Sequence, residues 1–242
     1  WEAIEYLRKY FATYQQVQND EAAKQAQIIE HRRRLEEVER DRQIRIVRFQ
    51  EQEKILHNIL PAHIAERMVR GERTIADSFE EVTVFFSDIV GFTALSQQVS
   101  AEKLVGLLNS IFSQFDQLAR KHGLEKIKTM GDSYMAVAGA PIKQDNHAER
   151  AALFALDVAN MMHAYRTQAG GHIEVRIGLH SGSVVAGIIG ENKLAYDLWG
   201  DAVNTASRME SHGETGKIHV SEGFVQSVGA SNFHFVERGE LE

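Results

Sequence analysis

The chain has 242 residues, of which 43% are hydrophobic, enough for one domain of ordinary size plus an appendage. Its formal net charge of −7 excludes general nucleic-acid binding, because an acidic surface repels a phosphate backbone. The absence of cysteine excludes disulfides and thiolate metal sites and fits a reducing compartment. No apolar run approaches the roughly 20 residues that span a bilayer. We therefore expect a cytoplasmic piece of a longer protein, and membrane attachment of that parent stays open.

Residues 1–60 contain neither glycine nor proline and are rich in Glu, Gln, Arg and Lys, a composition typical of a long exposed helix. Apolar residues recur there at three- and four-residue steps, and this seam comprises Leu35, Val38, Ile46, Phe49, Leu56 and Leu60. Arg42 and Glu53 interrupt the seam, and an extra four-residue step near Arg42 is a stutter, which locally unwinds a supercoil. We predict an imperfect two-stranded coiled coil; the alternative is a solvated helix packed on its own domain.

Pro61 is expected to end this helix, because proline lacks an N–H donor and disfavours helical geometry at the residue before it. A short helix should follow over residues 62–70, and from about Ser78 the composition becomes that of a mixed α and β domain. The predicted organisation is a signalling helix at 1–60, a linker with a short helix at 61–77, and a main domain at 78–242.

The main domain alternates strand and helix patterns. An apolar, β-branched run at 82–86 predicts a buried central strand, and a helix is expected after the N-cap candidate Ser100. Strands at 126–130 and 134–138 should form a hairpin, and Asn146 with Glu149 predicts a capping box for a helix ending near Tyr165. The remaining predictions are strands at 173–179, 184–189, 217–220 and 233–236 and a helix at 201–211. The sum is an α+β fold with helices on one face of a mostly antiparallel sheet.

Two aspartates, each within three residues of a glycine, lie at the ends of predicted strands. Asp88 follows the strand at 82–86, and Asp132 lies on the turn of the predicted hairpin. Hard oxygen ligands without a nearby histidine or cysteine favour Mg²⁺ or Mn²⁺ over zinc, and two such ions can promote departure of a phosphoryl leaving group. The loop at 89–93 leads toward a helix, whose first N–H groups can bind phosphate. Each aspartate taken alone is more often a turn residue that satisfies backbone donors.

Four ordered runs in the main domain resemble one known family. They are Phe86-Ser-Asp-Ile-Val-Gly-Phe-Thr93, Glu125-Lys-Ile-Lys-Thr-Met-Gly-Asp-Ser-Tyr134, Arg176-Ile-Gly-Leu-His-Ser-Gly182 with Val184-Val-Ala-Gly-Ile-Ile-Gly190, and Tyr196-Asp-Leu-Trp-Gly-Asp-Ala-Val-Asn-Thr-Ala-Ser-Arg-Met209. Together they resemble the catalytic domain of class III adenylyl and guanylyl cyclases, from about residue 78 to the C-terminus. The resemblance implies a ferredoxin-like βαββαβ fold, and the preceding helix resembles the signalling coiled coil of sensor-linked members.

The resemblance also implies which residues hold metal and phosphate. Asp88 and Asp132 match the two metal-binding aspartates, and the carbonyl of Ile89 matches a further ligand, for two Mg²⁺ or Mn²⁺ ions per site. Arg176 matches an arginine that reaches the terminal phosphates. The loop that holds the triphosphate corresponds to Ile89, Gly91, Phe92 and Thr93. The family usually continues with a lysine-bearing strand that also contacts phosphate, whereas this chain stops at Glu242, so we expect a C-terminal truncation.

Lys128 and Asp197 match the pair that reads adenine, where guanylyl cyclases resemble this chain but carry Glu and typically Cys. Strand alternation places Lys126 and Lys128 on one face, so spacing does not choose between them and only the motif selects Lys128. Asn204 matches the residue that orients the ribose and Arg208 the one that stabilises the pentacovalent phosphorus. Their four-residue spacing puts both on one face of a helix.

The resemblance implies an adenylate cyclase that converts ATP to 3′,5′-cyclic AMP and pyrophosphate. In the family the metal-binding aspartates and the phosphate-binding arginine come from one subunit. The residues that match Lys128, Asp197, Asn204 and Arg208 come from its partner. This chain carries both sets, so we expect a homodimer, with an upstream sensory or membrane domain acting through the N-terminal helix. The alternatives are a guanylate cyclase and a catalytically silent module that dimerises and relays signals.

Overall fold

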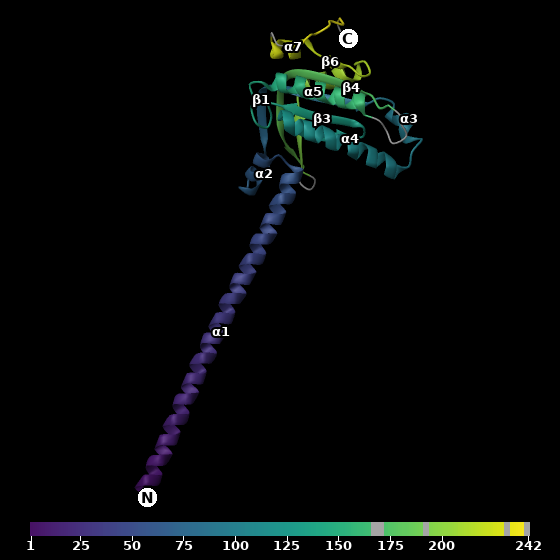
Figure 1. The fold of residues 1–242 in the computed structure, drawn as a ribbon. Coiled ribbons are helices and arrows are strands. Elements are labelled where there is room, and N and C mark those ends of the chain that lie inside the picture. Colours follow the sequence, from purple (N-terminus) through teal and green to yellow (C-terminus); the bar gives the residue numbers. More distant parts are fainter. Residues whose placement is uncertain (166–171, 191–193, 230–232, 240–242) are drawn as a thin grey trace. The chain divides into compact units, whose positions relative to one another are not determined.

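The computed structural model describes residues 1–165, 172–190, 194–229 and 233–239 (Figure 1). Contacts divide the chain into two compact units, Trp1–Ile59 and Leu60–Glu242. No helix of the described ranges is both long and apolar enough to cross a membrane.

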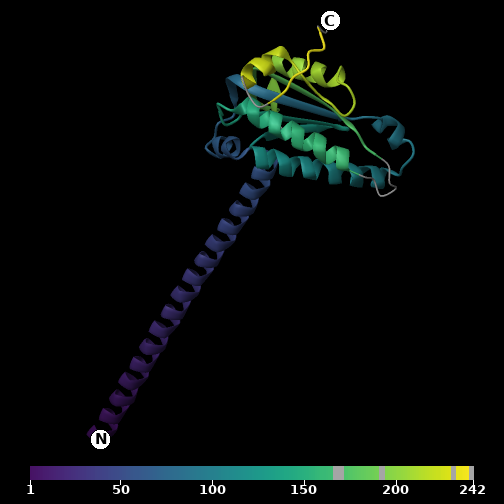
Figure 2. The same ribbon diagram turned by 45° about the horizontal axis from the view of Figure 1, so that its top comes forward.

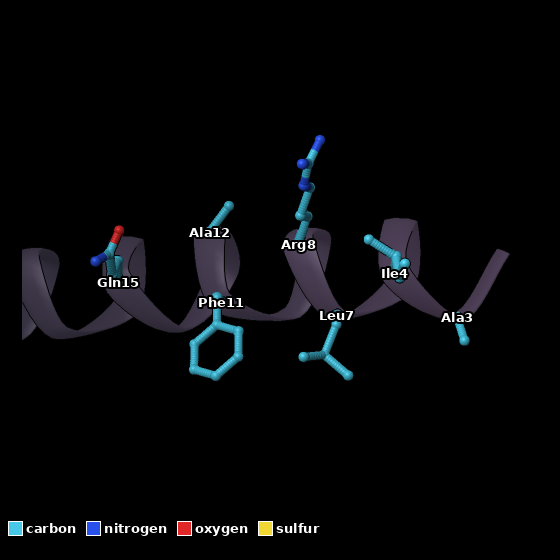
Figure 3. Close-up of a pocket in the computed structure, with 7 residues that line it drawn as sticks. All are labelled: Ala3, Ile4, Leu7, Arg8, Phe11, Ala12 and Gln15. Atoms are coloured by element: carbon cyan, nitrogen blue, oxygen red, sulfur yellow. The ribbon is translucent and has the colours of Figure 1, made fainter. Parts of the chain in front are cut away.

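The first unit is one helix, α1 (Glu2–Ile59), of 58 residues, as the absence of glycine and proline predicted. Most of its described apolar side chains are exposed; Leu35, Val38 and Phe49 are 57%, 61% and 54% accessible. Figure 3 shows Leu7 and Phe11 projecting to the same side of its first turns. A helix with such a stripe in water is stabilised by a partner that covers it. The two-stranded coiled coil stays a prediction.

Pro61 separates α1 from a short helix, α2 (Ala62–Val69), and Pro61 is the residue that precedes the first helical turn. Ile64 and Ala65 of α2 are fully buried. The Arg67 side chain forms ion pairs with Glu72 at 2.6 Å and with Asp77. These contacts tie α2 to the start of the first strand within the second unit.

The second unit is built on a six-stranded sheet. Its strands are β1 (Ala76–Ile89), β2 (Glu125–Met130), β3 (Ser133–Ala138), β4 (Val175–Ile189), β5 (Ala195–Trp199) and β6 (Ile218–Val220). The order is β2-β3-β1-β4-β5, all antiparallel, with β6 pairing β4 in parallel. Long, apolar β1 therefore runs through the centre between β3 and β4. The α+β fold with a mostly antiparallel sheet is confirmed.

Helices lie on both faces of this sheet. One face carries α4 (Ala101–His122) and α5 (His147–Ala164), seen side by side in Figures 1 and 2. Their apolar faces form the core with alternate residues of β4, namely Val175, Ile177 and Leu179. Between these residues Gly178 faces the other way, against α6 (Asp201–Ser211). The prediction that helices cover one face is wrong, because the short α6 packs on the opposite face.

Several local predictions are also wrong. The two strands expected at 173–179 and 184–189 are one strand, β4, because Gly182 pairs with Val82 in an extended backbone and does not break the ladder. Asn146 does not cap α5 with its side chain; its Oδ1 instead accepts a hydrogen bond from Arg150 Nε at 2.7 Å. Residues 233–239 form no strand.

The elements that sequence patterns did not identify are short: β5 and the helices α3 (Phe92–Ser96) and α7 (Glu222–Val228). The helix after Ser100 is confirmed, since Ser100 Oγ accepts from the Lys103 N–H. The hairpin of β2 and β3 and helix α6 are confirmed as well.

Three buried polar side chains link the sheet to helix α5, and they predict that stability depends on pH. Thr83 Oγ1 lies 2.8 Å from His147 Nδ1 and 2.7 Å from Ser181 Oγ. Burial lowers the pKa of His147, and the charges of Glu81 and Asp145 only partly oppose this. Because His147 binds a proton less readily when folded, this contribution to stability is complete above the unfolded pKa of about 6.5 and is lost as pH falls below it.

We predict that His147→Asn lowers the free energy of unfolding by about 1–3 kcal/mol at pH 7, because the buried Thr83 hydroxyl loses its hydrogen bond to His147 Nδ1. The variant should also flatten the loss of unfolding free energy between pH 7 and pH 5. Urea unfolding at both pH values tests this, with His234→Asn on the exposed C-terminal segment as the matched control. An acid-induced loss as steep in His147→Asn as in the unaltered chain would contradict the assignment.

Candidate active site

The central strand β1 ends in a polar cluster formed by register. Asp88 is the direct partner of Ser133 on β3 and of Arg176 on β4. Asp88 Oδ1 accepts from Ser133 Oγ at 2.9 Å, and Asp88 Oδ2 pairs with Arg176 Nη2 at 3.0 Å. Antiparallel partners project to the same side of a sheet, so the strand pairing alone brings these three side chains together.

Asp132 lies on the β2–β3 turn, one residue before Ser133. Burial raises the pKa of Asp132, and the neighbouring Asp88 carboxylate raises it further, whereas a backbone hydrogen bond and the charge of Arg176 lower it. The two carboxylates therefore lie within electrostatic reach of each other. Two half-buried carboxylates that repel each other provide oxygen ligands that suit a hard divalent cation. Among the described residues, no group of three or more histidine, aspartate or glutamate side chains is arranged around a metal position.

The loop after Asp88 begins α3. Ile89 is buried and paired with Val175, and the Val90 N–H donates to the Glu174 carbonyl at 2.9 Å. Gly91 precedes the helix with a φ of 76°, a left-handed conformation that favours glycine. Phe92 and Thr93 form the first turn of α3, where backbone N–H groups have no intrahelical acceptor.

Glu210 joins Asp88, Asp132 and Arg176 in what we call the carboxylate–arginine cluster. The sequence analysis did not identify Glu210 as a site residue. This residue of α6 is 8% exposed, and its Oε1 pairs with Arg176 Nε at 3.1 Å. Burial raises the pKa of Glu210 and the Asp88 charge acts the same way, whereas Arg176 opposes the rise. A signal was present: Ala202, Ala206 and Glu210 recur every four residues, so the acid lies on the buried stripe of the helix.

Lys128 and Asp197 form a second polar group. Lys128 Nζ on β2 donates to Asp197 Oδ2 on β5 at 2.5 Å, and Asp197 Oδ1 accepts from the Leu198 N–H at 2.9 Å. The prediction that Lys126 shares a face with Lys128 is wrong, because a β-bulge between them shifts the register. Lys126 points instead to Asp116 of α4, at 2.9 Å.

Asn204 and Arg208 lie on one face of α6, as their spacing predicted, but both are exposed. Ala202, Ala206 and Glu210 are the buried residues of the same helix. Within the described part of the chain, neither Asn204 nor Arg208 has a side-chain hydrogen bond or ion pair to the carboxylate–arginine cluster. Side-chain hydrogen bonds and ion pairs of the described residues therefore join Asp88 to Arg176 and Glu210, and Lys128 to Asp197, but do not join Asn204 or Arg208 to the carboxylate–arginine cluster.

Comparison with known proteins identifies the family. The sequence profile described as "Adenylate and Guanylate cyclase catalytic domain" matches residues 74–242, more than half of the chain. An adenylate cyclase of Mycobacterium tuberculosis (strain ATCC 25618 / H37Rv) is 44% identical over 190 residues, 78% of this chain and 43% of that protein. Guanylate cyclase soluble subunit beta-2 of Rattus norvegicus is 40% identical over 191 residues, 78% of this chain and 28% of that protein. The chain thus spans less than half the length of these relatives.

A solved structure shares the fold. The catalytic core of a rhodopsin-guanylyl cyclase with converted specificity, in complex with ATPαS, superimposes with a TM-score of 0.63 at 44% identity. The match covers 65% of this chain and 86% of that one. The sequence profile, the related sequences and the shared fold together show that this chain belongs to the family of adenylate and guanylate cyclase catalytic domains.

Proposed function

We propose that residues 78–242 act as an adenylate cyclase, converting ATP to 3′,5′-cyclic AMP and pyrophosphate. The observation that carries the proposal is the Lys128–Asp197 pair, a donor and an acceptor joined across β2 and β5. Asp197 can accept a hydrogen bond from the 6-amino group of adenine, while Lys128 donates to a ring nitrogen. Guanine presents a carbonyl oxygen where adenine has that amino group, so the same pair would leave polar groups mispaired.

We assign the carboxylate–arginine cluster to metal and triphosphate. Asp88 and Asp132, with the carbonyl of Ile89, suit Mg²⁺ or Mn²⁺, because these ions prefer oxygen ligands. Two such ions, when bound, lower the pKa of the ribose 3′-hydroxyl and neutralise charge at the α-phosphate. The chain itself holds the phosphates through Arg176 and through backbone N–H groups of residues 91–93.

The outward direction of Asn204 and Arg208 supports a homodimer. These two side chains are exposed on α6, whereas Glu210 on the buried face of that helix contacts Arg176. A second copy of the chain can bring its own Asn204 and Arg208 to the metal and phosphate residues of the first. Twofold symmetry then produces two equivalent sites. Asn204 would orient the ribose, and Arg208 would balance the charge that develops as pyrophosphate leaves.

Helix α1 fits a signalling role in this dimer. The exposed residues of its apolar seam, Leu35, Val38, Ile46 and Phe49, can pair with the same residues of the second chain, and the polar Arg42 and Glu53 weaken that pairing. Leu60, the last seam residue, is instead buried in the second unit. A weakly held register can shift between two states and change how the two chains meet. We assign its upstream partner to a sensory or membrane domain, and the catalytic domain to the cytoplasm, where ATP is available.

A guanylate cyclase is the rival function, since the rat guanylate cyclase soluble subunit beta-2 is 40% identical to this chain over 191 residues. The Lys128–Asp197 pair favours ATP over GTP. A catalytically silent relay module is disfavoured, because the chain retains Asp88, Asp132 and Arg208 together.

We predict that the unaltered chain turns over ATP in preference to GTP with Mn²⁺. Lys128→Glu combined with Asp197→Cys should lower kcat/KM for ATP by at least about 100-fold and raise it for GTP, because the hydrogen-bonding pattern is reversed. Cyclic nucleotide formation measures both. Lys126→Gln, on the opposite face of β2, is the control that should keep ATP preference. A preference for GTP in the unaltered chain would overturn the assignment to adenylate cyclase.

Mixed dimers test the shared site. Asp88→Asn chains and Arg208→Ala chains should each be inactive alone, whereas an equal mixture should recover about one quarter of full activity. Half of the randomly assorted dimers are then mixed, and each mixed dimer keeps one intact site of two. A mixture of Asp88→Asn with Asp132→Asn, both altered in the same half, should stay inactive. Mixed dimers captured by two affinity tags yet without turnover would rule out the shared site.

The seam of α1 gives a further prediction. Arg42→Leu with Glu53→Leu should strengthen helix pairing and change the basal rate of cyclic AMP formation, because the register of the paired helices becomes fixed. Thermal melting monitored by circular dichroism measures the strength of helix pairing, and a turnover assay measures the basal rate. Replacement of Arg40 by Leu, outside the proposed seam, is the control. A more stable helix with an unchanged basal rate would contradict a signalling role.

A further inference from the structure

Helix α6 approaches the sheet at Gly178 more closely than a side chain would allow. A Cβ added there would lie 2.2 Å from Glu210 N and 2.6 Å from Ala206 O, both backbone atoms. Glycine is therefore needed for this contact. Gly178 is two residues after Arg176 on the same face of β4, so the close approach places the Glu210 carboxylate beside the guanidinium.

The guanidinium of Arg176 is held from two sides. Glu210 engages Nε at 3.1 Å and Asp88 engages Nη2 at 3.0 Å. Guanidinium donors lie in one plane with fixed directions, so two anchors define where the remaining Nη1 donors point. Glu210 is the more buried anchor, at 11% side-chain exposure against 19% for Asp88.

Asp88 and Glu210 have different roles in the proposed reaction. In the proposed function Asp88 binds metal, and its carboxylate is then shared between metal and Arg176. Glu210 has no such competing role and lies on a helix packed against the sheet. We infer that Glu210 is a positioning residue, which keeps Arg176 directed at the triphosphate while Asp88 binds metal. This inference rests on the proposed function.

A purely structural role is the competing explanation, in which the Glu210–Arg176 pair only fastens α6 to the sheet. The two roles differ because opposite faces of α6 serve different sites of the dimer. The buried face carries Glu210 toward Arg176 of its own chain. The exposed face carries Asn204 and Arg208, which the proposed function assigns to the site of the partner. Loss of positioning harms only the site that uses Arg176 of that chain. Loosening of α6 would also harm the site that receives Arg208.

Mixed dimers separate these roles. In a dimer of an Asp88→Asn chain with an Arg208→Ala chain, the one intact site uses Arg176 of the Arg208→Ala chain and Asn204 and Arg208 of the Asp88→Asn chain. Adding Glu210→Gln to the Arg208→Ala chain should raise KM for ATP by about tenfold or more, since a charge-assisted contact is lost, with a smaller change in kcat. Adding Glu210→Gln to the Asp88→Asn chain should leave KM unchanged.

Direct binding provides a readout besides activity. The Glu210→Gln homodimer should bind 3′-deoxy-ATP, which cannot cyclise, about tenfold more weakly by calorimetry, at an unchanged melting temperature. Glu210→Asp should recover part of the affinity, because it keeps the carboxylate. Glu214→Gln, an exposed acid beyond α6, is the matched control and should bind as the unaltered chain does.

Two results would overturn the inference: equal KM effects of Glu210→Gln in either chain of the mixed dimer, or unchanged binding of 3′-deoxy-ATP. Failure of the proposed function has a different signature, in which the mixed dimers without a change at Glu210 have no activity. The binding measurement then still decides the role of Glu210.

Discussion

The pairing of β1 with β3 on one side and β4 on the other is the constraint on which the site depends. That register makes Asp88 the neighbour of both Ser133 and Arg176, and the turn before Ser133 brings Asp132 into range. Backbone hydrogen bonds distributed along the apolar centre of the sheet hold this arrangement. A slip of one residue would turn Asp88 to the face of α4 and α5 and bury a carboxylate among apolar side chains. The core thus fixes the position of the polar cluster.

Helix α6 divides the remaining polar residues between two directions. Its close contact with Gly178 turns Glu210 inward, and the helical period then turns Asn204 and Arg208 outward. The inward residue joins the arginine proposed to bind phosphate, whereas the outward pair has no place in that cluster. In the proposed dimer this helix would support one half-site and present the complementary half, so that a single chain would be incomplete. It also links the two proposed sites of a dimer through one packed element.

Patterns of several residues predicted the long helix, the β2–β3 hairpin and the capped α4. Features that depend on a single backbone irregularity or on tertiary packing escaped prediction. The bulge between Lys126 and Lys128 places the two lysines on opposite faces of β2, and no residue type in that segment predicts the bulge. The two strands predicted at 173–179 and 184–189 are one, because the pairing of Gly182 with Val82 continues β4. The role of Glu210 depends on the approach of α6 to Gly178, which is set only when helix and sheet meet.

In the proposed dimer, one ATP is held by two copies of the chain, with its phosphates at one and its base at the other. A crystal structure of the dimer with Mn²⁺ and 3′-deoxy-ATP measures this most directly. We expect anomalous density for manganese at Asp88 and Asp132 of one chain, and adenine against Lys128 and Asp197 of its partner. Triphosphate and adenine bound by residues of the same chain would contradict it.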